Sequence, residues 1–247
     1  MYSPEFKDIY SVPIKGVDGE ENFLEQFRGK ILVIVNTTGY CGYADQWPFL
    51  DAIQKEYQDK NVQIVYVPTN DFYYSVTYEE YKDGIKTGKE SQEYANRKYG
   101  VNWPFTELVS SRNTPCTLNG DFYDCENLEW IEQPEEHKKF TQAPRDHIYR
   151  FLIPNPEYEP MLANFQKYIT NSKGMPIACF TASAFSDSPG VQKNTHGMVG
   201  TREEEIANFK AVLDEIIATD TCATEKYIYR PYNLSEDNSE IIGLAQY

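Results

Sequence analysis

Apolar and polar positions follow a regular pattern in the first third of the chain. The apolar run 31–35 is short and unbroken, which predicts a buried strand. A polar, glycine-flanked turn carrying Cys41 follows it, and apolar residues then recur at the spacing of a helix over 46–58. Residues 61–67, which are mostly apolar, have the pattern of a second buried strand that is closed by Pro68. Strand, helix and strand joined by a short crossover predict two parallel neighbours in one sheet.

The pattern predicts further elements on both sides of this unit. Residues 1–28 are expected to form an arm that leads into a short β-hairpin with its turn at 16–19. The polar segment 75–99 is expected to contain a helix that ends near Gly100, since glycine commonly stops helices.

In the last third of the chain, residues 174–185 have the pattern of a strand, and the chain from Val191 onward is its expected hairpin partner. Thr201 and Glu204 have the spacing of a capping box, which indicates the start of a helix. One face of that helix carries Ile206, Phe209, Leu213 and Ile216.

The pattern loosens between these two parts. Six prolines interrupt residues 106–172, and short helices such as 160–169 are expected there. We therefore predict one domain over 1–218 with an irregular insertion at 109–173. Residues 219–247 are expected to form a C-terminal tail.

The charge balance restricts the classes of partner. The 247 residues include 23 Lys and Arg against 38 Asp and Glu, a formal net charge of −15. An acidic surface repels nucleic-acid phosphates and anionic membranes, so no nucleic acid is expected as a partner. No apolar run approaches the ~20 residues of a membrane span, and the N-terminus has no signal-peptide pattern. We expect a cytoplasmic or otherwise intracellular protein.

Five cysteines stand at irregular spacing: Cys41, Cys116, Cys125, Cys179 and Cys222. An odd number without a C-x-x-C pair indicates reduced thiols rather than a disulfide framework. The three histidines form no ligand pattern with any cysteine, so no metal site is expected. Cys41 has the best position for chemistry, because the N–H groups and dipole at a helix start stabilise a thiolate. The alternative is an inert buried thiol.

Twenty tyrosines are a high number for this length. Tyrosine is favoured at protein interfaces, so a homo-oligomer or larger assembly is one explanation, with the tail as a further contact. A tyrosine-rich core is the other explanation.

The order of the predicted elements is typical of a thioredoxin-like fold, and the motifs are more specific. Residues 29–36 resemble the G-K-x-x-x-I-V-N segment of the glutathione peroxidase family. Cys41 and Gly42, with Gln46 in register, resemble the C-G-x-x-x-Q segment that follows it in that family.

Two further segments resemble the family in the same order. Residues 68–72 resemble its F-P-C-N-Q-F segment, and 99–104 resemble its K-Y-G-V-x-F-P segment. The resemblance covers about 20–108 and resumes at the level of the fold around 174–218. It implies an α/β, thioredoxin-like fold, in which helices flank a central mixed β-sheet and the insertion and tail are additions.

The resemblance also implies a thiol peroxidase that reduces hydroperoxides and protects against oxidative stress. Cys41 would be the peroxidatic cysteine, whose thiolate attacks the peroxide, becomes a sulfenic acid and is reset by a thiol. That reductant would be glutathione or a thioredoxin-like protein acting as a co-substrate, with no cofactor bound. Asn36, Gly42, Gln46 and Asn70 would be neighbours of the site.

Other positions depart from the family's pattern. Asp71 occupies the position of the family's catalytic Gln, and a carboxylate there raises the pKa of a nearby thiol by like-charge repulsion. The family's W-N-F-T-K-F motif aligns with 175–180 and keeps only its last Phe. Pro176 instead resembles the cis-proline that packs against the active cysteine in thioredoxins.

The helix expected to carry a resolving cysteine contains none at 93–98. Cys116, Cys125 or Cys179 could substitute, although a mid-strand cysteine such as Cys179 is more often part of the core. The altered positions, the tyrosines and the tail also support a second hypothesis, a catalytically degenerate subunit with a structural or interaction role in a larger assembly. A thioredoxin-type reductase is disfavoured because no second cysteine follows Cys41 closely.

Overall fold

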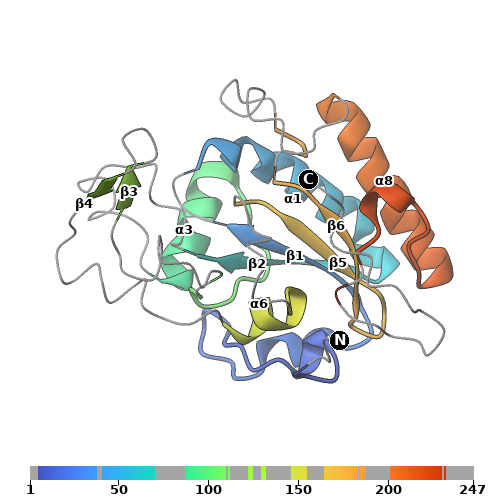
Figure 1. Cartoon of the computed structure of the whole chain (residues 1–247), viewed down its shortest axis with the longest axis horizontal. Coiled ribbons are helices and arrows are strands. Elements are labelled where there is room, and N and C mark those ends of the chain that lie inside the picture. Colours follow the sequence, from blue (N-terminus) through green and yellow to red (C-terminus); the bar gives the residue numbers. More distant parts are fainter. Residues whose placement is uncertain are drawn as a thin grey trace.

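A computed structural model of the chain describes its main sheet and the helices that pack around it (Figure 1). The described residues are 5–37, 41–69, 87–109, 111, 122–124, 129–131, 146–154, 164–182, 184–186, 201–229 and 231. For 122–124 and 129–131 only the backbone is described.

Four strands form the main sheet in the order β2-β1-β5-β6. They are β1 (Ile31–Thr37), β2 (Val62–Pro68), β5 (Lys167–Thr170) and β6 (Pro176–Phe180). β1 pairs in parallel with β2 and antiparallel with β5, and β5 pairs antiparallel with β6. Every residue of β1 is buried, because this inner strand is covered on both faces.

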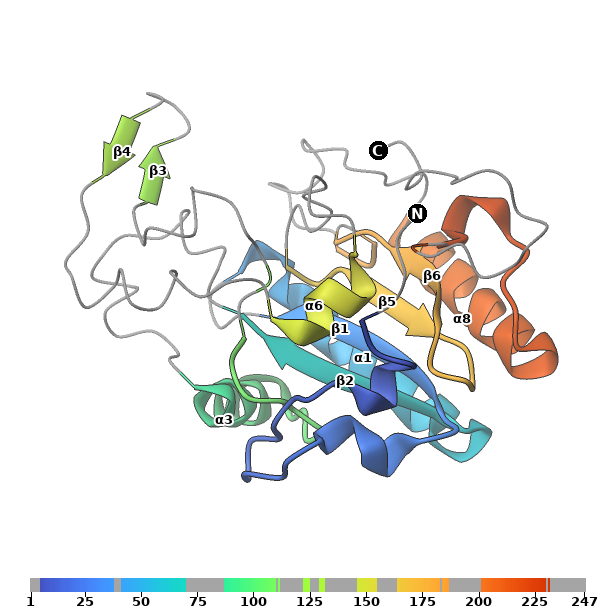
Figure 2. The ribbon, with the colours of Figure 1, turned by 60° about the horizontal axis from the view of Figure 1, so that its bottom comes forward.

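Helices cover both faces of this sheet (Figures 1 and 2). One face packs against α1 (Trp47–Tyr57) and α8 (Arg202–Thr219). The other face packs against α6 (His147–Leu152) and the 3-10 helices η1 (Ile9–Ser11) and η2 (Phe23–Phe27). Alternate residues of β1 therefore enter two separate core clusters, as the two-residue period of a strand requires.

Smaller elements complete the described part of the chain. They are α3 (Gly88–Tyr99), η3 (Gly42–Gln46), η4 (Gln58–Lys60), η6 (Glu225–Tyr227), and the antiparallel pair β3 (Phe122–Asp124) and β4 (Glu129–Ile131). Among the helices that the structure describes, none is long and apolar enough to cross a membrane.

The strand, helix and strand predicted over 31–67 are confirmed. The two apolar runs form β1 and β2 in parallel, and the helix between them begins as η3 and continues as α1. α3 ends at Tyr99, and Gly100 caps it, because its φ of 72° lets its N–H bond the carbonyls of Ala95 and Asn96. Thr201 and Glu204 form the predicted capping box at the start of α8. The α/β, thioredoxin-like fold is also confirmed.

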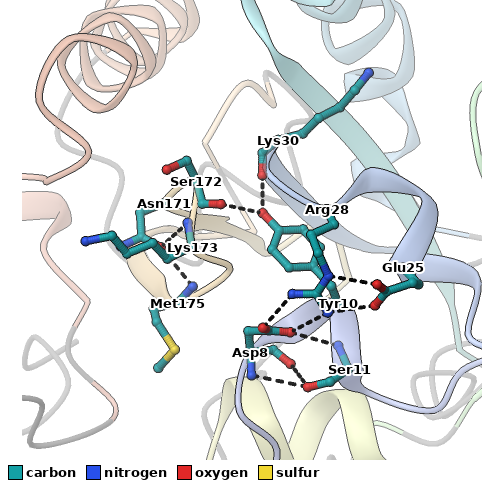
Figure 3. A network of polar contacts seen from close by, with 10 residues as sticks. All are labelled: Asp8, Tyr10, Ser11, Glu25, Arg28, Lys30, Asn171, Ser172, Lys173 and Met175. Atoms are coloured by element: carbon teal, nitrogen blue, oxygen red, sulfur yellow. Dashed lines mark hydrogen bonds and ion pairs between the residues drawn. The ribbon is translucent and has the colours of Figure 1, made fainter.

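The N-terminal segment does not form the predicted hairpin. Its turn is present, with the Gly19 N–H donating to the Gly16 carbonyl at 3.0 Å, and the Gly16 and Phe23 N–H groups donate across it to the carbonyls of Glu20 and Ile14. The described residues on either side nevertheless form no strand, and the helices η1 and η2 lie before and after the turn. The apolar side chains of these helices pack against the sheet face instead of pairing as strands. Polar contacts hold the segment in place (Figure 3): Arg28 Nη1 donates to Asp8 Oδ2 at 2.8 Å, and Tyr10 Oη donates to the Lys30 carbonyl.

β5 lies within the segment 109–173 that was predicted to be an irregular insertion. It is an inner strand between β1 and β6. The hairpin partner of β6 therefore precedes it in the chain, and the predicted partner at 191–200 lies outside the described residues. The domain limits themselves stay predictions.

The helix predicted over 160–169 is wrong in its described part. Residues 164–165 form a turn, and β5 begins at Lys167. Phe165 and Ile169 have helical spacing, but Phe165 adopts a φ of 66°, which a right-handed helix does not contain. Both side chains are buried in the core instead.

The described C-terminal residues pack against the edge of the sheet. The Tyr229 N–H donates to the Ile177 carbonyl at 2.9 Å, and Tyr227 stacks on Phe180 with ring centroids 3.9 Å apart. Seven described tyrosines are buried, which favours a tyrosine-rich core as the explanation of their number. These are Tyr10, Tyr57, Tyr66, Tyr149, Tyr168, Tyr227 and Tyr229.

Candidate active site around Cys41

Cys41 lies between the C-terminal end of β1 and the first turn of η3. It is the N-cap residue of η3, with an extended backbone, and Gly42 begins the helix. The Tyr43 N–H donates to Cys41 Sγ at 3.4 Å, because the first N–H groups of a helix have no carbonyl partner within it. The residue is partly exposed and packs against the edge of the core.

A second donor reaches the sulfur from the turn before β5. Asn164 Nδ2 lies 3.8 Å from Cys41 Sγ, and Asn164 is buried. Asn36, buried at the end of β1, donates to Asn164 Oδ1 at 3.4 Å and accepts from the Gln166 N–H at 2.9 Å. Asn36 therefore holds in place the amide that contacts the sulfur.

Burial raises the pKa of the Cys41 thiol to about 11. The hydrogen bonds from Tyr43 and Asn164 act in the opposite direction, since they stabilise the thiolate, while the charge of Asp45 raises the pKa further. Because burial is the largest effect, the resting sulfur is a thiol at neutral pH. The N–H groups at the start of η3 favour the thiolate, but they do not lower the pKa of Cys41 enough to make the thiolate the main form at neutral pH.

Gln46 ties the end of η3 to two other segments. Its side chain is fully buried, and Nε2 donates to the Ala182 carbonyl at 2.6 Å. Its Oε1 accepts a hydrogen bond from Lys167 Nζ at 2.6 Å. Gln46 therefore stabilises the turn that follows the sulfur.

Asp45 and Arg202 link the same turn to α8. Arg202 Nη2 lies 2.7 Å from Asp45 Oδ2, and Ser186 Oγ donates to Asp45 Oδ1 at 2.9 Å. Arg202 Nε also donates to the Phe185 carbonyl at 2.7 Å. The guanidinium group partly compensates the negative charge that Asp45 brings near the sulfur.

The structure corrects the alignment of the W-N-F-T-K-F motif. The sequence A-N-F-Q-K-Y at 163–168 has the same spacing, and its Asn is the residue in contact with the sulfur. The alignment with 175–180 is wrong, because β5 and not β6 pairs with the strand that leads to Cys41. Ala163 stands at the Trp position and lies outside the described residues. The N-F-x-K spacing is the signal by which the sequence reveals this segment.

Pro176 does not have the predicted role. No peptide bond among the described residues is cis, and Met175 and Pro176 are both described. Pro176 pairs with Thr170, whose hydroxyl accepts from the Leu32 N–H near the start of β1. It therefore lies toward the opposite end of the sheet from Cys41.

Cys179 faces the other side of the sheet from the sulfur. It packs in the core cluster that faces α6, η1 and η2, and Gln166 Nε2 donates to its Sγ at 3.4 Å. The structure therefore does not bring Cys179 and Cys41 together, and both are reduced cysteines. The other predicted residues, Asn70, Asp71, Cys116 and Cys125, lie outside the described residues, so their roles stay predictions.

The described part of the chain offers thiol chemistry at this place. It contains no group of three His, Cys, Asp or Glu side chains that could hold a metal ion. What it provides is a partly exposed thiol, two N–H donors directed at its sulfur, and a buried polar network behind it.

Comparisons with known proteins agree with the motifs. Residues 9–121 match the family model described as glutathione peroxidase. The chain is 25% identical over 196 residues to thioredoxin/glutathione peroxidase BtuE of Escherichia coli, a match that covers 75% of this chain and 94% of that protein. It is 31% identical over 101 residues to the glutathione peroxidase homolog BsaA of Bacillus subtilis, which covers 41% of this chain and 58% of that protein.

Among solved structures, the chain is similar to a crystal structure of T. cruzi GPX1. The identity is 15% and the TM-score is 0.44, over 72% of this chain and 88% of that one. The family match at 9–121 includes β1, the turn with Cys41, α1, β2 and α3. On this match and that to its relatives, the segment 9–121 of the chain belongs to the glutathione peroxidase family.

Proposed function

We propose that the chain is a thiol peroxidase that reduces hydroperoxides through Cys41. The observation that carries the proposal is the placement of this sulfur. It is partly exposed at the end of a buried strand, and N–H donors from Tyr43 and Asn164 are directed at it. The names of the relatives, which include a thioredoxin/glutathione peroxidase, support the same activity.

The reaction at Cys41 transfers one oxygen atom to the sulfur. An S–O bond forms as the O–O bond of the peroxide breaks, so the sulfur is oxidised to a sulfenic acid and the peroxide is reduced. The thiol proton ends on the departing oxygen, which leaves as water or an alcohol. The donors from Tyr43 and Asn164 stabilise the negative charge on the sulfur during the attack.

A thiol reductant then returns the sulfur to its resting state. A first thiol attacks the sulfenic acid, which releases water and leaves a mixed disulfide, and a second thiol frees Cys41 and leaves the reductant as a disulfide. We propose glutathione or a thioredoxin-like protein as this reductant. An external reductant fits better than Cys179, which faces the other side of the sheet. Reduced cysteines at positions 41, 179 and 222 suit a reducing, intracellular compartment, which we propose as the location.

The second hypothesis, a degenerate structural subunit, has less support. Seven of the tyrosines are buried in the core, so they do not support an interaction surface. The Asn of the family's W-N-F-T-K-F motif is also not lost, because Asn164 contacts the sulfur.

Steady-state peroxide consumption tests the proposed function. The reduced protein is assayed with hydrogen peroxide or an organic hydroperoxide, and with glutathione or with thioredoxin and its reductase. We expect turnover with one of these pairs and its loss in Cys41→Ser. Cys222→Ser, at a buried cysteine elsewhere, is the matched control and should retain turnover. Turnover that survives in Cys41→Ser contradicts the proposal.

A further inference from the structure

Lys167 has an amino group that is completely buried at the start of β5. Its Nζ donates to Gln46 Oε1 at 2.6 Å and to the Phe165 carbonyl at 2.7 Å. It also donates to the carbonyls of Ala184 at 3.0 Å and Thr181 at 3.3 Å. These four acceptors are uncharged oxygens from three separate segments of the chain.

Burying an ammonium group in a core costs free energy, because the charge loses its hydration. Burial lowers the pKa of Lys167 to about 7, although the charges of Cys179, Glu205 and Asp45 act in the opposite direction. A linear apolar side chain of similar length fills the same space without this desolvation cost. The contacts of the amino group therefore indicate what this residue does.

Each contact belongs to a segment that shapes the surroundings of Cys41. Gln46 ends the helix η3, whose N-cap is Cys41. Phe165 follows Asn164, the donor to the sulfur, and has a φ of 66°, so its backbone needs a partner that fixes it. The carbonyls of 181 and 184 flank Ala182, which accepts the other hydrogen bond of the Gln46 side chain.

We propose that Lys167 is a positioning residue for the reactive thiol. Its amino group joins the turn after Cys41, the turn before β5 and the loop after β6, and so keeps Asn164 Nδ2 directed at Cys41 Sγ. This inference rests on the proposed function in one respect, namely that the positioned thiol reacts with hydroperoxide. Lys167 acts through Gln46 and through the turn that carries Asn164, so its removal should change the reactivity of the sulfur indirectly.

The rate at which iodoacetamide alkylates Cys41, followed over pH by peptide mass spectrometry, tests the proposal without peroxide. Lys167→Met removes the N–H donors and keeps a linear apolar side chain. We expect the pKa of Cys41 to rise and its alkylation below that pKa to slow about tenfold, the size of one hydrogen bond to a charged atom. Gln46→Met removes the link to η3 and should slow alkylation in the same direction.

Tyr229→Phe is the matched control for lost stability. It removes a buried hydroxyl that donates to the Leu152 carbonyl on the other side of the sheet, and it should leave the pH–rate profile of Cys41 unchanged. An unchanged profile in folded Lys167→Met and Gln46→Met overturns the proposal, and so does an equal shift in Tyr229→Phe. Failure of both variants to fold also counts against it, because a group that only positions the site is not required for folding.

The alkylation test also separates this inference from the proposed function. A protein that consumes no peroxide but shows a thiol dependent on Lys167 refutes the peroxidase activity and supports the positioning role. A protein that consumes peroxide, but whose Cys41 is alkylated at the same rate in Lys167→Met, supports the peroxidase activity and refutes the positioning role.

Discussion

The reactivity of the single residue Cys41 results from opposing effects on one sulfur. Burial and the charge of Asp45 disfavour the thiolate, and the donors from Tyr43 and Asn164 favour it. Because burial is the largest effect, only a small fraction of the sulfur is thiolate at neutral pH. The peroxidase therefore depends on each donor that lowers the pKa.

The pH dependence of Cys41 labelling follows from this balance. Only the thiolate reacts, so the alkylation rate should rise about tenfold per pH unit from neutral pH toward the pKa of about 11. Labelling of the Cys41 peptide at a series of pH values measures it. A rate that levels off near neutral pH contradicts the effect of burial.

Asn164→Ala should slow peroxide reduction about tenfold, because it removes one hydrogen bond to the charged sulfur. Asn61→Ala is the control, since Asn61 donates to the Gly29 carbonyl at the other end of β1. Stopped-flow consumption of peroxide by the reduced protein gives both rates. Equal rates in the two variants show that Asn164 does not act on the sulfur.

The sequence predicted Cys41 but not Asn164, and the reason is the range of the contacts. The strand, turn and helix around Cys41 are local features that apolar spacing reveals. Asn164 reaches the sulfur across 123 positions of sequence, through the pairing of β5 with β1. The spacing of residues along the chain does not show which strands pair. The W-N-F-T-K-F motif was for this reason aligned with 175–180 instead of with the segment that leads into β5.

At the scale of elements, the position of β5 builds the site. Its antiparallel pairing with β1 brings the start of β5 to the end of β1, so Asn164 and Cys41 lie at the same edge of the sheet. Toward the other end of the same strands, the turn between β5 and β6 packs on the N-terminal segment (Figure 3). Both ends of β5 are thus fixed by contacts far apart in sequence.

Substitution of Gly174, which lies in that turn, tests how closely the turn packs on the N-terminal segment. Its φ is 80°, and a Cβ there would lie 2.6 Å from Tyr10 Cε2. Gly100 has a φ of 72°, and apart from its chain neighbours no described residue has an atom within 4 Å of its Cβ position. Gly100→Ala should therefore lower the free energy of unfolding by about 1–2 kcal/mol from backbone conformation alone. Gly174→Ala should lower it by roughly 1–3 kcal/mol more, because Tyr10 must move.

Urea unfolding of the two glycine variants measures this difference. An equal loss of stability in Gly174→Ala and Gly100→Ala contradicts the close approach of Tyr10. The N-terminal hairpin was predicted wrongly for a related reason. The turn at 16–19 is a local signal, but the anchoring of η1 and η2 on the sheet depends on partners such as Ser172 in a distant segment.

At the scale of the whole molecule, stability depends on pH through Lys167. Burial lowers its pKa from 10.5 to about 7, so between these values the folded protein has lost a proton that the unfolded chain keeps. Stability therefore rises with pH in this window, while below it both states are protonated and the full cost of burying the charge is present. Above pH 9.0 the raised pKa of Cys41 acts in the opposite direction.

The free energy of unfolding at several pH values from about 7 to 9.0 measures this dependence. The stability of the wild type relative to Lys167→Met should increase by up to roughly 1.4 kcal/mol per pH unit. The comparison cancels the titration of groups that the two proteins share. Parallel pH profiles contradict the lowered pKa of Lys167.

The central claim is that Cys41 is the sulfur that hydroperoxide oxidises. The most direct measurement adds one equivalent of hydrogen peroxide to the fully reduced protein without a reductant, traps sulfenic acid with dimedone and locates it by peptide mass spectrometry. Cys41 should be labelled ahead of each of the other four cysteines. Absence of the label from Cys41, or equal labelling of all five cysteines, contradicts it.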